Sequence, residues 1–154
     1  MYEVQLKTRP YHILLAEDDA DDRELFLEAI ALVDPAIQVK TVENGEILIS
    51  YLKEAVVFPD CIFLDLNMPR KNGKQCLVEI RRNKSTEKIP IVIYTTSPSN
   101  RDIDETYNQG ASCFIRKPNS FEELKELLDR YVKSSFQDTA PKRLRHDFVL
   151  NARP

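Results

Sequence analysis

The sequence has few glycines and cysteines, no tryptophan and no long hydrophobic run. Three of its 154 residues are glycine and three are cysteine. No stretch approaches the roughly 18 apolar residues that a membrane-spanning helix requires, so we expect no membrane segment. The odd number of cysteines, each inside an apolar stretch, favours reduced thiols in a protein core over a disulfide framework. No Cys-x-x-Cys or histidine-rich spacing indicates a zinc site.

An excess of positive charge is also absent. The chain has 22 Lys and Arg residues against 25 Asp and Glu residues, for a net charge of −3. Proteins that bind nucleic acid along their whole length are normally basic, so this class is disfavoured. Residues 1–10 are expected to form an N-terminal extension, and they lack the apolar stretch of a signal peptide. We therefore expect a cytoplasmic protein with one folded domain.

Five short apolar stretches alternate with stretches of helical period. Strands are predicted at residues 11–16, 37–42, 61–64, 91–94 and 113–115. Helices are predicted at residues 25–33, 47–52, 73–80, 103–107 and 121–131. Four of the strands are almost entirely apolar, as in sheets that are covered on both faces. The pattern predicts an α/β fold with (βα)5 topology: a doubly wound parallel sheet of five strands in the order 2-1-3-4-5, which is flavodoxin-like.

The folded domain is expected to span residues 11–135, with a C-terminal tail at residues 136–154. The start of the tail has the composition of a linker. Phe148, Val149 and Leu150 form a short apolar run in the otherwise polar tail. Two interpretations stay open: the run belongs to a frayed terminus, or it docks on a partner or on a second subunit.

Polar side chains gather at the predicted carboxyl ends of the strands, where ligands bind in open α/β sheets. Acidic residues follow the first strand, Asp65 ends the third, threonines end the fourth and Lys117 ends the fifth. Crowded carboxylates need a counter-charge, and oxygen ligands of this kind suit Mg²⁺. With Lys117 as a second positive charge, this rim is typical of a phosphoryl site in which a carboxylate is the nucleophile.

Four motifs, in this order, resemble those of response-regulator receiver domains of two-component signalling, the CheY-like superfamily. The matching segments are residues 13–19 (Ile-Leu-Leu-Ala-Glu-Asp-Asp), 63–69 (Phe-Leu-Asp-Leu-Asn-Met-Pro), 93–96 (Ile-Tyr-Thr-Thr) and 110–118 (Gly-Ala-Ser-Cys-Phe-Ile-Arg-Lys-Pro). The resemblance covers residues 11 to about 133. It implies a stand-alone, single-domain regulator similar to those paired with bacteriophytochromes or hybrid sensor kinases.

The resemblance implies a phosphoacceptor and a metal site. Asp65 would accept the phosphoryl group. Mg²⁺, or Mn²⁺ in its place, would be held by Glu17, Asp18, Asp65 and the backbone carbonyl of Asn67. The first acidic position is Glu17, where a shorter aspartate is the commoner residue.

The resemblance also implies residues for phosphoryl contact and for switching. Thr95, Thr96 and Lys117 would contact the phosphoryl oxygens, and Thr96 is larger than the alanine or glycine often found there. Phosphorylation would draw Thr95 inward and let Phe114, which lacks a phenolic hydroxyl, turn into the space behind it. The face formed by the fourth helix, fifth strand and fifth helix would then change.

The implied partners are a sensor histidine kinase or histidine phosphotransfer protein, which donates the phosphoryl group, and an unknown downstream protein. A homodimer through the fourth and fifth helices is a further expectation. The 19 residues after residue 135 are too few for a DNA-binding output domain. The chain would catalyse only the transfer to Asp65 and its own dephosphorylation, and would not be an enzyme for an external substrate.

Other functions fit the motifs less well. A metal-dependent phosphatase or phosphotransferase for small molecules often carries Asp-x-Asp after its first strand, and residues 65–67 lack the second carboxylate. A nucleotide-binding module needs a phosphate loop where this chain has acidic residues. An interaction module that works without phosphorylation stays open. Asp19, Asp21 and Asp22 are interpreted as an acidic helix start.

Overall fold

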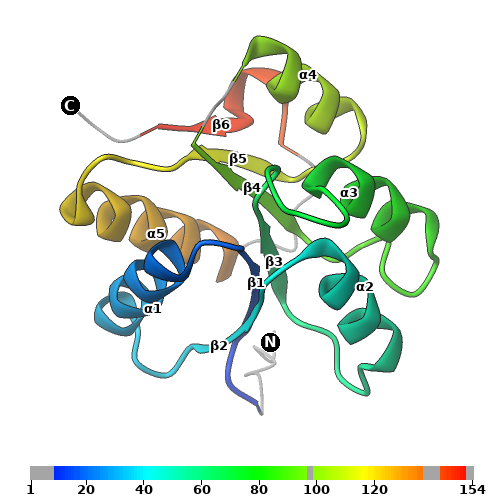
Figure 1. The fold of residues 1–154 in the computed structure, drawn as a ribbon. Helices are drawn as coiled ribbons and strands as arrows, with labels where there is room; N and C mark the ends of the chain where they lie inside the picture. Colours follow the sequence, from blue (N-terminus) through cyan, green and yellow to red (C-terminus); the bar gives the residue numbers. More distant parts are fainter. Residues whose placement is uncertain (1–8, 97–98, 137–142, 152–154) are drawn as a thin grey trace, which may run out of the picture.

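Six parallel strands form the centre of the computed structural model, which describes residues 9–96, 99–136 and 143–151 (Figure 1). The strands lie in the order β2-β1-β3-β4-β5-β6. Their bounds are β1 His12–Ala16, β2 Gln38–Val42, β3 Cys61–Leu64, β4 Ile91–Thr95, β5 Cys113–Arg116 and β6 Val149–Leu150. The helices are α1 Ala20–Val33, α2 Gly45–Glu54, α3 Gly73–Arg82, α4 Asn100–Asn108, α5 Phe121–Phe136 and the short 3-10 helix η1 Arg145–Asp147.

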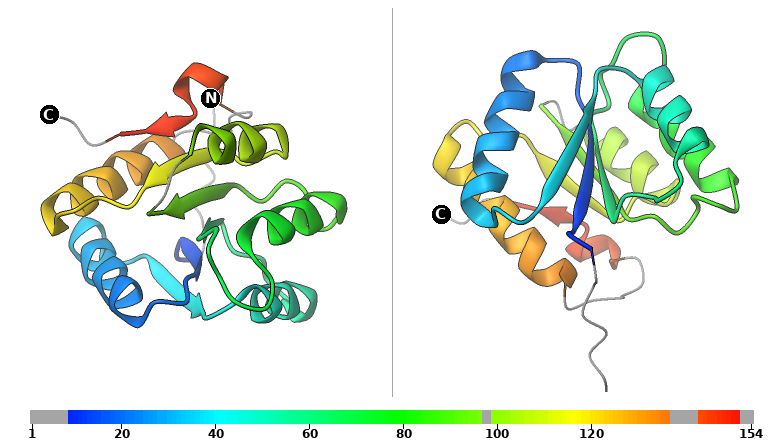
Figure 2. Two further views of the ribbon diagram at one scale, coloured as in Figure 1. Left: turned by 45° about the horizontal axis from the view of Figure 1, so that its top comes forward. Right: turned by 90° about the horizontal axis from the view of Figure 1, so that it is seen from below.

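The long helices cover both faces of the sheet. α1 and α5 pack on one face, and α2, α3 and α4 pack on the other (Figures 1 and 2). Side chains alternate along each strand, so Ile13 and Leu15 of β1 join the α1/α5 layer whereas Leu14 and Ala16 join the opposite layer. All four are fully buried, which explains why the central strands are almost entirely apolar.

Side-chain caps set the starts of the helices. The Asp19 carboxylate accepts a hydrogen bond from the Asp22 amide at 2.9 Å, and α1 therefore begins at Ala20, well before the apolar period that predicted it. α4 ends just before Gly110, whose φ of 98° lies in the left-handed region. Gly110 thus ends the helix as the sequence predicted.

The sheet has a sixth strand that the sequence did not predict. The order of the first five strands is confirmed, but β6 lies beside β5, with Phe114 paired to Val149 and Ile115 paired to Leu150. Phe148 is fully buried in the core. The interpretation of residues 148–150 as part of a frayed terminus was therefore wrong. These residues dock on the sheet of their own chain. A two-residue strand is too short to show the alternation that identifies a strand in a sequence.

The boundaries of the extension and the tail stay predictions. Residues 1–8 and most of the predicted linker lie outside the described residues. Among the described helices, none combines the length and the apolar composition that would let it cross a membrane.

A close backbone approach occurs where α3 begins. The Gly73 amide donates to the Leu66 carbonyl at 3.0 Å, which folds the loop after β3 back on itself. A Cβ atom on Gly73 would lie 2.3 Å from the Asp65 carbonyl oxygen and 2.7 Å from Leu66 Cα. Both are backbone atoms, so they cannot move aside as a flexible side chain could. Glycine at this position therefore keeps the end of β3 in place.

We expect Gly73→Ala to destabilise the fold. Because the methyl group meets fixed backbone, the free energy of unfolding should fall by about 1–3 kcal/mol, as in other overpacked sites. Urea denaturation measures the change. Glu28→Ala on the exposed side of α1 is the control and should stay within about 0.5 kcal/mol. Equal stability of the two variants would contradict the argument.

Candidate functional site

Three charged residues are placed at the carboxyl edge of the sheet directly after strands. Glu17 follows β1, Asp65 follows β3 and Lys117 follows β5. Each backbone amide still bonds to a neighbouring strand: Glu17 to the Val42 carbonyl (3.0 Å), Asp65 to the Ala16 carbonyl (3.1 Å) and Lys117 to the Thr95 carbonyl (2.8 Å). The parallel ladder thus extends by one residue at each strand end and fixes the three side chains at one rim.

The ammonium group of Lys117 lies among three carboxylates. It forms an ion pair with Glu17 Oε1, and its Nζ atom is 2.9 Å from Asp22 Oδ2 and 3.1 Å from Asp65 Oδ2. The Lys117 side chain is only 7% exposed. Asp22 was interpreted as part of an acidic helix start, and it does lie in the first turn of α1. Its second role as a partner of Lys117 has no signal in the sequence, because every acidic residue near a helix start looks alike.

Both carboxylate oxygens of Asp65 have partners. Oδ2 faces Lys117, and Oδ1 accepts a hydrogen bond from the Asn67 amide at 3.0 Å. The Asn67 side-chain amide in turn donates to the Thr95 hydroxyl at 3.4 Å. Asp65 is 4% exposed and Thr95 is fully buried. A polar connection thus runs from Asp65 to the end of β4.

Burial and charge determine the protonation of the site. Burial raises the pKa of Glu17 to about 8, and the neighbouring Asp65 carboxylate adds to this rise, while Lys117 opposes it. Burial alone would lower the pKa of Lys117, but the Glu17 and Asp22 carboxylates outweigh it and hold that pKa above its usual value. Lys117 is therefore charged at neutral pH, whereas the raised pKa of Glu17 favours its protonated form more than that of an ordinary glutamate in the absence of a metal.

The carboxylates also fit a divalent cation. One oxygen from each of Glu17, Asp18 and Asp65 lies within 4.8 Å of the others. Glu17 and Asp65 are buried, Asp18 is exposed, and Glu17 Oε1 has no well-oriented hydrogen-bond donor among the described residues. Hard oxygen ligands and an open side suit Mg²⁺ or Mn²⁺, which keep part of their water shell. The part played by the Asn67 carbonyl stays a prediction.

The structure places the remaining predicted residues at different depths. Thr95 ends β4 in the interior, whereas Thr96 is exposed at the rim. Phe114 is fully buried on β5, and its ring centroid lies 6.0 Å from that of Phe148. Their roles in phosphoryl contact and switching stay predictions. Phe148 was noticed as an apolar residue in the tail, but its contact with Phe114 depends on a strand that the sequence did not reveal.

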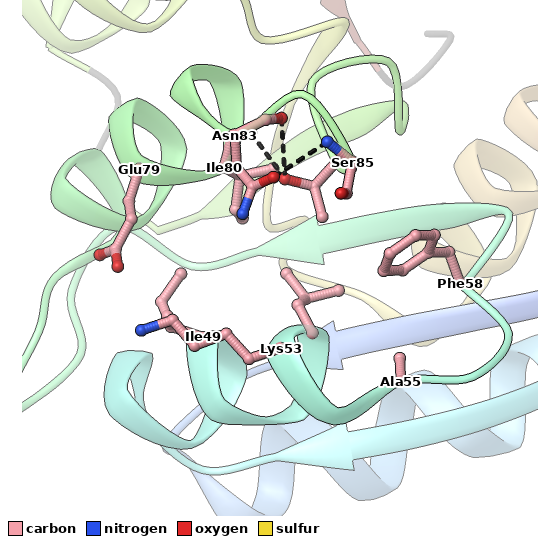
Figure 3. A pocket seen from close by; sticks show the side chains of 10 residues that line it. Ile49, Lys53, Ala55, Phe58, Glu79, Ile80, Asn83 and Ser85 are labelled. Atoms are coloured by element: carbon pink, nitrogen blue, oxygen red, sulfur yellow. Dashed lines mark hydrogen bonds between the residues drawn. The ribbon is translucent and has the colours of Figure 1, made fainter.

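A hollow of about 350 Å³ lies away from this site, between the later turns of α2 and α3 (Figure 3). It is lined by Ile49, Leu52, Lys53, Ala55, Phe58, Glu79, Ile80, Asn83, Ser85 and Thr86. Its lining includes none of the predicted site residues. The Thr86 hydroxyl donates to the Ile80 carbonyl at 2.8 Å, so this polar group is already satisfied within the protein. The cluster of charged residues that could bind a metal or a phosphoryl group therefore lies at the carboxyl edge of the sheet and not in this hollow.

Comparison with known proteins decides the family. A family model described as the response regulator receiver domain matches residues 13–129. The chain belongs to the response-regulator receiver family. The motifs predicted this membership, and it assigns the chain to two-component signalling.

Known receivers are similar to this one in sequence and in fold. Response regulator Rcp1 of Synechocystis sp. is 28% identical over 124 residues, which cover 77% of this chain and 84% of Rcp1. The crystal structure of the phosphorylated cyanobacterial phytochrome response regulator RcpA has 31% identity and a TM-score of 0.77, over 86% of this chain and 97% of RcpA. The Mn²⁺-bound form of Rcp1 has 26% identity and a TM-score of 0.74, over 88% and 100% of the two chains. The predicted order of the first five strands is thus a property that this receiver shares with solved ones.

Glu17 should make the stability of the metal-free receiver depend on pH. The unfolded chain loses this proton near pH 4.3, but the folded protein keeps it until about pH 8. Between these two pH values the folded state binds more protons than the unfolded chain. The stability that the Glu17 proton contributes is therefore complete below the lower pH and is lost as the pH rises to about 8.

The measurement is urea denaturation in EDTA between pH 5 and 8, with Glu17→Gln as the comparison. The titration of groups that both proteins share cancels when their free energies of unfolding are subtracted. The free energy of unfolding of the unsubstituted protein should fall relative to that of Glu17→Gln as the pH rises from 5 to 8. Mg²⁺ should reduce the difference, because a bound cation favours the ionised carboxylate. A difference that does not change with pH would show that Glu17 titrates at its ordinary pKa.

Proposed function

We propose that this receiver accepts a phosphoryl group on Asp65 from a phosphohistidine of a sensor kinase or histidine phosphotransfer protein. The observation that carries the proposal is the setting of Asp65, whose two oxygens face Lys117 and the Asn67 amide beside the carboxylates of Glu17 and Asp18. A carboxylate in this setting is oriented and lies next to positive charge. The proposed reaction takes place in the cytoplasm, where such donors present their phosphohistidines.

The transfer moves one phosphoryl group and consumes no other reactant. An Asp65 oxygen attacks phosphorus, the phosphorus–nitrogen bond of the donor breaks, and the electron pair stays on the imidazole of the donor. A Mg²⁺ or Mn²⁺ ion held by Glu17, Asp18, Asp65 and the Asn67 carbonyl would neutralise the charge of the phosphoryl oxygens. Lys117 lies 3.1 Å from Asp65 Oδ2 and can turn its ammonium to a phosphoryl oxygen without leaving the site.

Signalling would follow from the link between Asp65 and β4. Thr95 is joined to Asp65 through Asn67, so a phosphoryl group on Asp65 offers the Thr95 hydroxyl a new acceptor. We propose that Thr95 moves inward, that Phe114 follows, and that the face formed by α4, β5 and α5 changes for a downstream protein. In this proposal the chain acts on no external substrate, and hydrolysis of its own aspartyl phosphate resets it. Its dimerisation through α4 and α5 remains a proposal of the same kind.

Intact-mass spectrometry after incubation with acetyl phosphate tests the proposal. We expect the protein to gain the mass of one phosphoryl group in the presence of Mg²⁺, and to gain none in EDTA. Asp65→Asn should gain none in either condition, while Asp21→Asn, an exposed residue of α1 outside the site, should behave as the parent. A folded protein that gains no mass with Mg²⁺ would contradict the phosphoacceptor role and favour an interaction module independent of phosphorylation.

Thr95→Ala separates phosphorylation from its propagation. We expect the rate of phosphorylation by acetyl phosphate to stay within a few-fold of that of the unsubstituted protein, because Thr95 supplies no ligand to the proposed metal. Amide hydrogen exchange in β5 should no longer respond to phosphorylation, because the hydroxyl that reads the phosphoryl group is missing.

Two further variants control this measurement. Thr95→Ser, which retains a hydroxyl, should restore the exchange response. Thr96→Ala at the exposed neighbouring position should leave it unchanged. A full response in Thr95→Ala would show that the signal takes another route.

A further inference from the structure

The segment of residues 143–151, here called the C-terminal segment, lies across all three elements of the proposed signalling face. Arg145 of η1 donates to Asp104 Oδ1 of α4 from Nη2 at 2.8 Å and from Nε at 3.1 Å. Arg130 of α5 donates to the Asn151 carbonyl at 2.7 Å. Between them β6 pairs with β5. The face that should change on phosphorylation is therefore covered by the chain itself, as the position of β6 in Figure 1 shows.

One aromatic residue anchors this cover to the switch position. Phe148 is fully buried, and its ring meets Tyr107 of α4 at a centroid distance of 5.1 Å and Phe114 of β5 at 6.0 Å, both edge to face. The Phe148 carbonyl also accepts a hydrogen bond from the Phe114 amide at 2.9 Å. Phe148 thus contacts Phe114 through both its ring and its backbone. A turn of the Phe114 side chain cannot leave its contact with the Phe148 ring intact, because packed interiors have few voids.

We propose that the C-terminal segment is an autoinhibitory cover that Phe114 releases when Asp65 is phosphorylated. This inference rests on the proposed function. An inward turn of Phe114 removes one of the two rings that hold Phe148 and leaves a void beside it, which weakens docking of the segment. Release uncovers the edge of β5 together with Asp104 and Tyr107 of α4.

The uncovered surface has a definite chemistry, because the segment shows what binds there. It accepts a chain in which a 3-10 turn places a basic side chain on Asp104 and an aromatic side chain against Tyr107, and in which the next two residues pair with β5 in parallel. A downstream protein with an exposed turn of the form Arg-x-x-aromatic, followed by two residues that add to the sheet beside β5, would match it. The C-terminal segment and such a partner would compete for one site.

Coupling of this kind acts in both directions. If phosphorylation weakens docking of the segment, then loss of docking must favour the phosphorylated state by the same factor. Phe148→Ala should therefore raise the affinity of the full chain for beryllofluoride, a phosphoryl analogue that binds to a carboxylate with Mg²⁺. We expect a rise of about 5-fold or more, the lower end of the range for coupled sites. Phe58→Ala is the matched control, since this partly buried aromatic packs beside the hollow between α2 and α3, away from the segment.

Hydrogen exchange of the full chain, measured residue by residue by NMR, tests release directly. The Phe114 amide is the reporter, because its hydrogen bond goes to the segment. Its exchange should accelerate at least several-fold when Mg²⁺ and beryllofluoride are added. The Ile62 amide, which bonds to the Pro90 carbonyl at 2.9 Å inside the sheet, should keep its rate. In Phe148→Ala the Phe114 amide should exchange rapidly without any addition.

The outcomes separate this inference from the proposed function. If beryllofluoride protects amides around Asp65 and Thr95 while the Phe114 amide keeps its slow exchange, the cover does not respond and the inference is wrong, although the phosphoacceptor role stands. If Phe148→Ala and Phe58→Ala change the beryllofluoride affinity equally, the effect is general destabilisation and the inference is also wrong. If beryllofluoride changes nothing anywhere, the phosphoacceptor role is wrong and the inference with it.

Discussion

The ammonium group of Lys117 holds together a cluster of carboxylates that would otherwise repel one another. Glu17, Asp22 and Asp65 come from three different elements, and each places an oxygen beside the same nitrogen. The Lys117 and Asp65 side chains are only 7% and 6% exposed. Charges this deeply buried are tolerated only when they are paired, so the ends of β1, β3 and β5 must meet with little error in position. A phosphoryl group and a cation would bring new charges of both signs to this cluster. The site thus depends on charges that can change partners without leaving a buried charge unpaired.

The site and the surface that it would control are connected by short contacts through the edge of the sheet. Asn67 links Asp65 to Thr95, and the Thr95 carbonyl accepts a hydrogen bond from the amide of Lys117, the residue that follows β5. Phe114 lies on the same strand, in contact with Phe148. These contacts lie in the loop after β3, at β4 and β5 and in the C-terminal segment, which are neighbours in space, so a small displacement needs to travel only a short distance. The hollow between α2 and α3 lies outside this route.

Much of the fold and of the site could be predicted because strong local signals agree with each other. Apolar runs give β1, β3, β4 and β5, and alternation of apolar and polar residues gives β2. The residues that follow the strands, Asp65 and Lys117 above all, become neighbours through the parallel arrangement alone. Asp22 and Phe148 could not be predicted in the same way. The role of Asp22 depends on how far the first turn of α1 leans over the site, and that of Phe148 depends on β6, whose two residues carry no periodicity. Both are consequences of tertiary packing, which a local pattern does not encode.

β6 also bears on the solubility of the protein. An open strand edge offers unpaired backbone groups to other chains and is a common starting point for aggregation. In this sheet β2 forms one edge, with exposed Gln38 and Lys40, whereas at the other end two residues of β6 shield the almost wholly buried, apolar β5. Any state in which β6 detaches presents an apolar edge to the surrounding solution. Such a state is safe only while it is brief or while another chain occupies the edge, so the same nine residues that would cover the signalling face also shield the protein from aggregation.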